Sequence, residues 1–205
     1  EFTNAVMVSN LFDKEKNLSA VLHAVDSLKT VYPNFKLNII GGGEDETKLK
    51  QLTVDLALTN HITFKGILPQ DAVYKELSSA SFLICNSNYE TFSVVIAEAL
   101  ACGTPVLATR CGGPEEYVTE QFGKLIPLHN PEELKNGIVF MMQNHASFSR
   151  EKMMQFAQAS FNPTAITQQF ISIYNPLISK WEAGNTREIL TIPHSWKVLD
   201  VGSGD

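Results

Sequence analysis

Short apolar segments alternate with segments of helical periodicity along most of the chain, and this alternation constrains the fold more than any other feature. The expected strands span residues 6–9, 37–40, 62–64, 82–85, 106–109 and 124–126. Between the first two strands, apolar residues recur at helical spacing, at Leu18, Val21, Leu22, Val25 and Leu28. Because parallel strands need helical crossovers, the pattern predicts an α/β fold: a doubly wound parallel sheet of Rossmann type, with helices on both faces.

Composition limits the classes of function. The 205 residues suffice for one α/β domain with residues left over. A net charge of −6 argues against a nucleic-acid partner, which requires a basic surface. No apolar run approaches the length of a membrane span. The three cysteines form no Cys-x-x-Cys pair, so we expect buried free thiols in a reducing, cytoplasmic setting.

The two ends of the chain suggest a piece of a larger protein. The chain begins at Glu1 rather than at an initiator Met, and residues 196–205 read as an apolar strand running into a Gly-x-Gly turn. That ending resembles the first strand and glycine loop of an S-adenosylmethionine-dependent methyltransferase, with a frayed tail or terminal hairpin as the alternative. We expect one domain over residues 1–181, followed over 182–205 by a linker and the truncated start of a possible second domain.

Residues 86–118 carry most of the recognisable chemistry. Glu90 lies in a loop, and Glu98 lies in an apolar helix that ends at Gly103. At a rise of 1.5 Å per residue the two acids are ~12 Å apart. That separation suits one carboxylate at each end of a nucleotide sugar, with the free N–H groups of residues 92–95 facing the diphosphate. For Glu90 taken alone, a favourable interaction with the helix dipole is the alternative.

The same segment resembles a known family. Glu90-Thr91-Phe92-Ser93, followed by residues 98–106 and by Gly112-Gly113 with an acid, is similar to the donor-site signature of the retaining GT-B glycosyltransferases of group 1. This large family includes bacterial mannosyl-, glucosyl- and galactosyltransferases, and the resemblance spans roughly residues 5–180. It implies that residues 1–181 are the C-terminal, nucleotide-sugar-binding half of a GT-B fold. The intact enzyme would transfer a hexose, with retention, to an unknown acceptor.

The resemblance also implies roles for individual side chains. Glu90 matches the acid that contacts hydroxyls of the transferred sugar, and Glu98 matches the acid that contacts the ribose. Lys16 aligns best with the lysine that grips the diphosphate, with Lys14 as the competitor and solvated lysines as the alternative for both. Asn10 stands where the family usually has an arginine, so one expected cation is missing.

Backbone groups at the carboxyl ends of the strands are expected to complete the site. The amides of residues 91–94 would face the diphosphate, and Ser93 would either add a hydroxyl or cap the helix. The glycines would permit close approach to the donor, with ordinary strand-to-helix turns as the alternative, and Arg110 could compensate for the missing arginine. We expect Glu90 and Lys16 to act in catalysis. The expected donor-binding residues are Asn10, Lys14, Gly41, Gly43, Gly66, Thr91, Phe92, Ser93, Val94, Glu98, Gly112 and Gly113.

Cofactor and partner expectations follow from the same reading. The histidines share no metal-ligand spacing and there is no Asp-x-Asp, so we expect no metal and no cofactor beyond the donor substrate. The acceptor would be held mostly by an N-terminal domain absent from this chain, and any peripheral membrane contact would come through that domain. The chain alone is therefore expected to be inactive. The alternatives are a nucleotide-binding module or a sugar-nucleotide epimerase on the same architecture.

Overall fold

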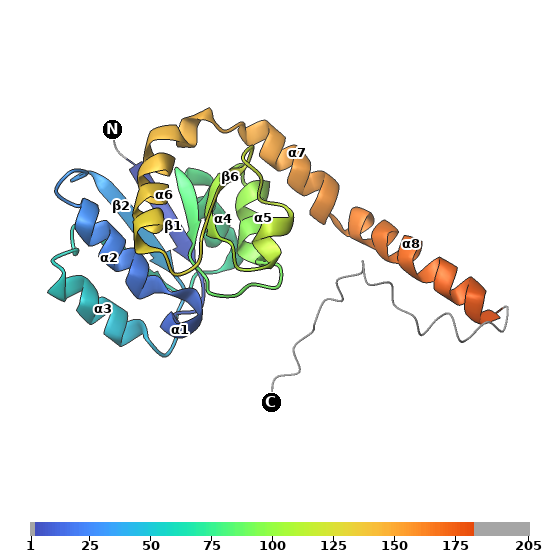
Figure 1. Ribbon diagram of the computed structural model, residues 1–205, viewed down its shortest axis with the longest axis horizontal. Coiled ribbons are helices and arrows are strands. Elements are labelled where there is room, and N and C mark those ends of the chain that lie inside the picture. The colour runs from blue at the N-terminus through green and yellow to red at the C-terminus, as the bar shows by residue number, and fades with distance from the viewer. Residues whose placement is uncertain (1–2, 183–205) are drawn as a thin grey trace. The chain divides into compact units, whose positions relative to one another are not determined.

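The computed structural model describes residues 3–182, in which strands alternate with helical segments up to the sixth strand (Figure 1). The strands are β1 (Thr3–Val8), β2 (Phe35–Ile40), β3 (Ile62–Gly66), β4 (Phe82–Cys85), β5 (Val106–Thr109) and β6 (Gly123–Ile126). The α-helices are α1 (Asp13–Lys16), α2 (Leu18–Leu28), α3 (Glu46–Asp55), α4 (Gln70–Ser79), α5 (Val94–Ala101), α6 (Pro131–Asn144), α7 (Arg150–Phe161) and α8 (Pro163–Glu182). Two 3₁₀ turns are η1 (Gly113–Glu116) and η2 (His145–Ser147).

The strands form one sheet in the order β3-β2-β1-β4-β5-β6. Every neighbouring pair is parallel. The chain therefore winds outward from β1 through β2 and β3, returns to β4 beside β1, and winds outward in the other direction. The doubly wound α/β fold predicted from the alternation of elements is confirmed.

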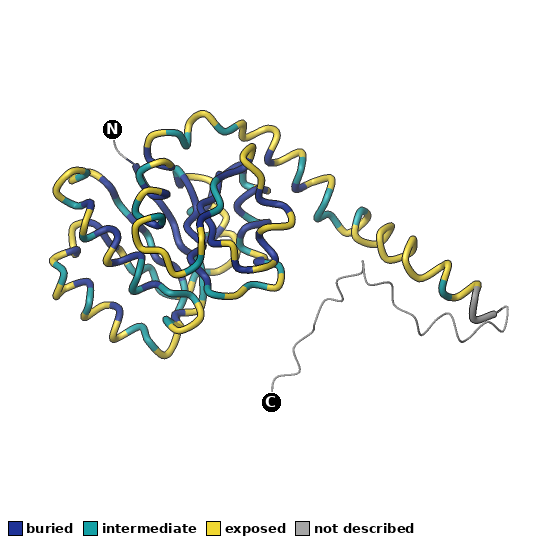
Figure 2. Tube along the Cα trace, viewed as in Figure 1, coloured by how far each residue is buried: buried dark blue, intermediate teal, exposed yellow. Residues whose placement is uncertain are grey.

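Helices cover both faces of this sheet and bury its strands. Helices α2, α3 and α6 pack together on one face, and α4 and α5 pack together on the other (Figure 1). Burial is concentrated along the strands (Figure 2), and every residue of β4 and β5 is buried. Helix α2 buries its predicted apolar stripe, where each fully buried Leu or Val side chain contributes about 1.5–3 kcal/mol relative to exposure.

Two local features of the chain are a 3₁₀ turn after Gly112 and a proline inside a helix. The segment after Gly112 enters the single 3₁₀ turn η1 rather than an α-helix, because the backbone leaves helical geometry at Tyr117, whose side chain is buried. Helix α8 does not end at Pro176 but continues to Glu182. A proline inside a helix removes one backbone hydrogen bond, and the residues around it can still remain helical.

The sheet opens between its two central strands. β1 and β2 are paired over the whole of both strands, whereas β1 and β4 are paired only at Ala5 with Phe82 and at Val6 with Leu83. The last residues of β1 and β4 are therefore not held together by ladder hydrogen bonds. This is also the position where the winding direction reverses, which is where doubly wound sheets form a ligand-binding crevice.

The chain divides by its internal contacts into two compact units, Glu1–Ala157 and Gln158–Asp205. The sheet lies in the first unit, and the second contains the end of α7 and all of α8. The expected linker and second-domain start lie outside the described residues from position 183 onward. Within the part of the chain that the structure describes, no helix combines the length and the hydrophobicity needed to cross a bilayer.

Candidate active site

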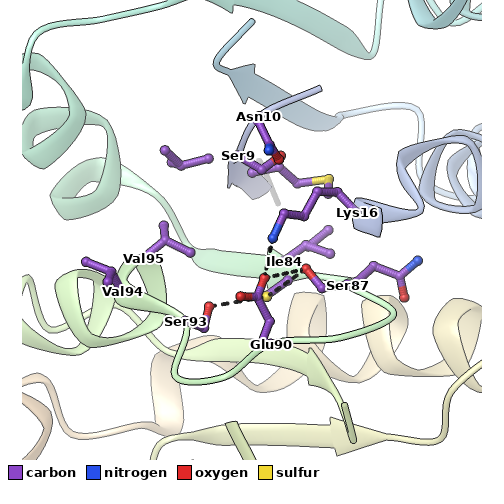
Figure 3. A pocket seen from close by; sticks show the side chains of 13 residues that line it. Ser9, Asn10, Lys16, Ile84, Ser87, Glu90, Ser93, Val94 and Val95 are labelled. Atoms are coloured by element: carbon purple, nitrogen blue, oxygen red, sulfur yellow. Dashed lines mark hydrogen bonds and ion pairs between the residues drawn. The ribbon is translucent and has the colours of Figure 1, made fainter. Parts of the chain in front are cut away.

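A cavity of about 260 Å³ lies at the opening between β1 and β4. Figure 3 shows the side chains that line it. They come from residues 7–10 at the end of β1, Lys16 of α1, residues 84–87 at the end of β4, Glu90, and residues 93–95 at the start of α5. The prediction that the site lies at the carboxyl ends of the strands thus agrees with the cavity, which uses the loops after β1 and β4.

An ion pair crosses this cavity. The Lys16 ammonium lies 2.7 Å from Glu90 Oε1, and the two side chains are 19% and 15% exposed (Figure 3). Ser87 Oγ donates a hydrogen bond of 2.7 Å to the same oxygen. Two residues 74 positions apart in sequence are therefore brought together because their loops follow adjacent strands.

Lys14 lies outside the cavity. Its side chain is exposed, and its backbone carbonyl accepts a 2.7 Å hydrogen bond from the Asn88 side-chain amide. The backbone N–H of Asn88 also bonds the carbonyl of Glu15, at 2.7 Å. These contacts join α1 to the loop that carries Glu90. Lys16, the residue after Glu15, lines the cavity.

Neither Asn10 nor Arg110 adds a positive charge to the cavity wall. Asn10, at the position of the family arginine, lines the cavity with a neutral amide (Figure 3). Arg110 is exposed and lies 3.5 Å from Glu115 of η1. Among the described residues that line the cavity, Lys16 is the only Lys or Arg and Glu90 the only Asp or Glu.

The expected glycines join the loops to one another. A Cβ at Gly43 would lie 2.6 Å from the Leu11 backbone nitrogen, so the loop after β2 packs directly on the loop after β1. Gly41 donates its N–H to the Gly66 carbonyl at 2.9 Å, which links that loop to the end of β3. Within the described residues, these three glycines do not line the cavity. Their visible role is loop packing.

The Gly112-Gly113 pair packs in the same way on the loop that carries Glu90, residues 86–93, which we call the glutamate loop. Glu90 and Gly112 form an isolated parallel bridge, and the Gly113 N–H donates to the Glu90 carbonyl at 2.7 Å. A Cβ at Gly113 would overlap the Thr91 carbonyl. The structure thus shows these glycines in close approach to the backbone of residues 90–91, and their predicted approach to the donor stays a prediction.

Tyr117 holds the backbone at the start of α5. Tyr117 OH donates to the Ser93 carbonyl at 3.0 Å and to the Phe92 carbonyl, and its ring lies 5.3 Å from the Phe92 ring. Ser93 has a left-handed backbone (φ +65°) and makes no side-chain cap bond. Its hydroxyl instead lies 3.7 Å from Cys85 Sγ beside the cavity, so of the two predicted roles the cap is wrong. Val94 lines the cavity, and Thr91 is exposed.

Glu98 has a protein partner. Its Oε1 accepts a 2.6 Å hydrogen bond from the Gln70 side chain at the start of α4, and the residue is partly exposed. Glu98 does not line the cavity. The carboxylate in this apolar helix is therefore hydrogen-bonded to the Gln70 side chain.

The thiols of the first unit are reduced. Cys85, in the cavity wall, and Cys111, beside the glutamate loop, are free and buried. Burial raises the pKa of both thiols, that of Cys111 to about 11, and the negative charge of Glu90 adds to the effect on Cys85. Both groups are therefore neutral and poorly nucleophilic at neutral pH.

The arrangement has no donor set for a metal. Over residues 3–182, no three His, Cys, Asp or Glu side chains are grouped so that they could hold a metal ion. The cavity instead offers one ammonium, one carboxylate, several hydroxyls and the N–H groups at the start of a helix. Such a set suits an anionic, hydroxyl-rich ligand.

Comparison with known proteins agrees with this chemistry. The profile of the family described as "Glycosyl transferases group 1" matches residues 3–161. The chain belongs to this family of glycosyl transferases. The matched range includes every residue that lines the cavity.

Individual relatives and structures extend the family match. A D-inositol 3-phosphate glycosyltransferase of Mycobacteroides abscessus is 32% identical over 158 residues, covering 74% of this chain and 35% of that protein. The sucrose-phosphate synthase of Thermosynechococcus elongatus superimposes with a TM-score of 0.74 at 27% identity, covering 86% of this chain and 46% of that one. Anabaena HepE in complex with UDP gives 0.74 at 22% identity, covering 85% and 49%.

The likeness to these structures identifies the fold as the Rossmann-like fold of GT-B glycosyltransferases. The chain spans about a third of the length of the curated relative and about half of the two solved chains.

Several residues of the cavity carried no predicted role. Ser87, Asn86 and Ser9 line it, and Tyr117 supports it from outside. Asn86 donates to the Asn17 carbonyl at 3.0 Å, whereas Ser9 Oγ is buried without a hydrogen-bond partner among the described residues. The sequence signal available for Ser87 was its position three residues before Glu90 at the end of a buried strand.

Proposed function

We propose that this chain binds the nucleotide-diphosphate sugar of a glycosyltransferase that moves a hexose to an acceptor with retention of anomeric configuration. The observation that carries the proposal is the Lys16–Glu90 pair in the cavity at the switch point of the sheet. An ammonium beside a helix start suits the diphosphate, and a carboxylate 2.7 Å away suits the hydroxyls of the attached sugar.

In the proposed reaction, the bond from the anomeric carbon to the diphosphate oxygen breaks and the nucleoside diphosphate leaves with the bonding electrons; an acceptor hydroxyl oxygen bonds to the anomeric carbon, and its proton passes to the departing diphosphate oxygen. Lys16 and the N–H groups at the start of α5 stabilise the charge that develops on the leaving group. Glu90 orients the sugar through its hydroxyls, so that the anomeric carbon is presented to the acceptor. Glu98 contacts the ribose, while its Oε1 accepts one hydrogen bond from Gln70. The roles of Lys16 and the helix amides are those a metal would otherwise fill, and we propose transfer without one.

We further propose that the isolated chain binds nucleotides without completing transfer. The chain covers 35% of the D-inositol 3-phosphate glycosyltransferase that it resembles, so groups that bind the acceptor are expected in another part of the protein. The isolated chain would therefore act as a nucleotide-binding module. Membership of the glycosyl transferase family disfavours the alternative that the protein is a sugar-nucleotide epimerase. The free, reduced cysteines support a cytoplasmic location.

The test has two parts. Calorimetry of the chain with UDP, GDP and ADP and their sugars should give binding for one nucleotide series, and Lys16→Ala should weaken it. Radiolabelled donors with a broad acceptor panel should give multiple-turnover transfer by the intact protein and none by the chain alone. The absence of binding to every nucleotide would refute the donor site, and turnover by the chain alone would refute the need for further acceptor groups.

A further inference from the structure

Ser87 lies between the end of β4 and Glu90, and its side chain is almost fully buried. Its Oγ donates to Glu90 Oε1 at 2.7 Å (Figure 3). We infer that Ser87 is the positioning residue that fixes the Glu90 carboxylate for sugar binding. The inference rests on the proposed function, and it assigns to Ser87 a role in the chemical step rather than in nucleotide affinity.

Ser87 is itself rigidly placed. Its backbone carbonyl accepts a 2.5 Å hydrogen bond from Thr109 Oγ1, at the buried end of β5. Its Oγ also lies 3.7 Å from Cys85 Sγ. The hydroxyl therefore projects from a site fixed by the neighbouring strands β4 and β5, and it directs its proton to Glu90.

The hydrogen bonds that Lys16 and Ser87 donate to Glu90 are expected to respond differently when a donor binds. Both fall on Oε1, which leaves Oε2 for a sugar hydroxyl. Lys16 is the diphosphate ligand under the proposed function, so its ammonium turns from Glu90 to the phosphate oxygens. Ser87 faces no such competitor. In the donor complex, the Ser87 bond is then the side-chain contact that keeps the carboxylate in place.

The backbone of the glutamate loop is fixed separately. Glu90 N donates to the Cys111 carbonyl at 3.1 Å, and the Glu90 carbonyl accepts from Gly113. These bonds do not restrain the side-chain torsions of Glu90. Removing the Ser87 hydroxyl is therefore expected to loosen the carboxylate and leave the loop intact.

The test compares Ser87→Ala with wild type in the intact protein. We expect kcat/KM for transfer to fall roughly tenfold, the scale of one charge-assisted hydrogen bond, with the Kd of the nucleoside diphosphate unchanged. Ser87→Thr, which keeps the hydroxyl, should recover most of the activity. Ser27→Ala is the matched control, because its hydroxyl also makes a 2.7 Å bond, to the Ala24 carbonyl of α2, far from the cavity.

A double-mutant cycle separates positioning from folding. If Ser87 acts through Glu90, Ser87→Ala should cost nothing further in a Glu90→Ala background. Wild-type transfer by Ser87→Ala, or a loss that adds in full to that of Glu90→Ala, would overturn the inference while the proposed function stands. The absence of transfer by the wild type with every nucleotide sugar would overturn the proposed function, and this inference with it.

Discussion

Glu90→Gln is expected to tighten the binding of a nucleoside diphosphate that carries no sugar. In the structure, the Lys16 ammonium is paired with Glu90 at 2.7 Å. A diphosphate must break that pair before it can use Lys16, and without a sugar it gives Glu90 no hydroxyl in return. Glutamine keeps the shape of the side chain and removes the competing charge, so Lys16 becomes available to the ligand.

The size of the gain follows from the burial of the pair. Exposed ion pairs contribute about 0.2–1 kcal/mol, and charge-assisted hydrogen bonds in protected sites contribute about 1.5–3 kcal/mol. With side chains 19% and 15% exposed, the Lys16–Glu90 pair lies between these cases. Releasing it should recover ~1–2 kcal/mol, or about five- to thirtyfold in Kd.

Calorimetry with the nucleotide that binds best would measure this change. Glu44→Gln is the control, since Glu44 is an exposed acid in the loop after β2 and its removal changes the net charge by the same amount. A similar gain in both variants would assign the effect to overall charge. Weaker binding by Glu90→Gln would refute the competition for Lys16, as would a gain that persists when Lys16 is also replaced by Met.

Three further substitutions examine other parts of the site. By calorimetry, Lys16→Ala should weaken diphosphate binding more than Lys14→Ala, because only Lys16 enters the cavity; the reverse order would mean that the lysine alignment is wrong. Glu98→Gln should weaken nucleoside diphosphate binding by ~1–3 kcal/mol if the carboxylate holds the ribose, and equal affinity would remove it from the site. Tyr117→Phe should lower the free energy of unfolding in urea by about 1–2 kcal/mol through its lost bonds to two backbone carbonyls. In the Tyr117→Phe variant, Ser93→Gly should recover part of the lost stability, because glycine adopts a φ of +65° without strain. If no stability is recovered, backbone strain at Ser93 does not contribute to the loss.

The fold could be predicted from the sequence, and so could the placement of Lys16 and Glu90 in neighbouring loops, because both depend on chain order; the ion pair between the two side chains was not predicted. Alternating apolar strands and amphipathic helices lead to a doubly wound sheet, and this topology puts the loops after β1 and β4 side by side. Lys16 and Glu90 lie in those two loops. Their proximity needed no knowledge of side-chain packing, which explains why the motif sufficed to select both residues.

The partners of the glycines and of Ser93 depended on three-dimensional contacts that no local pattern specifies. From the sequence, Gly43 and Gly113 were expected to let the donor approach closely, whereas the close contacts that the structure shows are with the backbone of Leu11 and Thr91 in neighbouring loops. The Ser93 cap was predicted from residue preference at a helix start. Tyr117 lies 24 residues downstream, and its bonds to the carbonyls of this segment hold a backbone conformation in which that cap bond is not made.

If the sequence resemblance places a family arginine at position 10, Asn10 and the Lys16–Glu90 pair have a common consequence. With arginine at position 10, the cavity would hold two cations and one carboxylate, and it would attract a diphosphate even in its resting state. With asparagine, the single ammonium is neutralised by Glu90, so the resting cavity has no net side-chain charge. Attraction of the donor then depends on two contributions. The N–H groups at the start of α5 attract the diphosphate, and the sugar hydroxyls bind Glu90 in place of Lys16 when Lys16 moves to the diphosphate. Under the proposed function, such a site discriminates in favour of the intact nucleotide sugar, because only the complete donor supplies a new partner to both members of the pair.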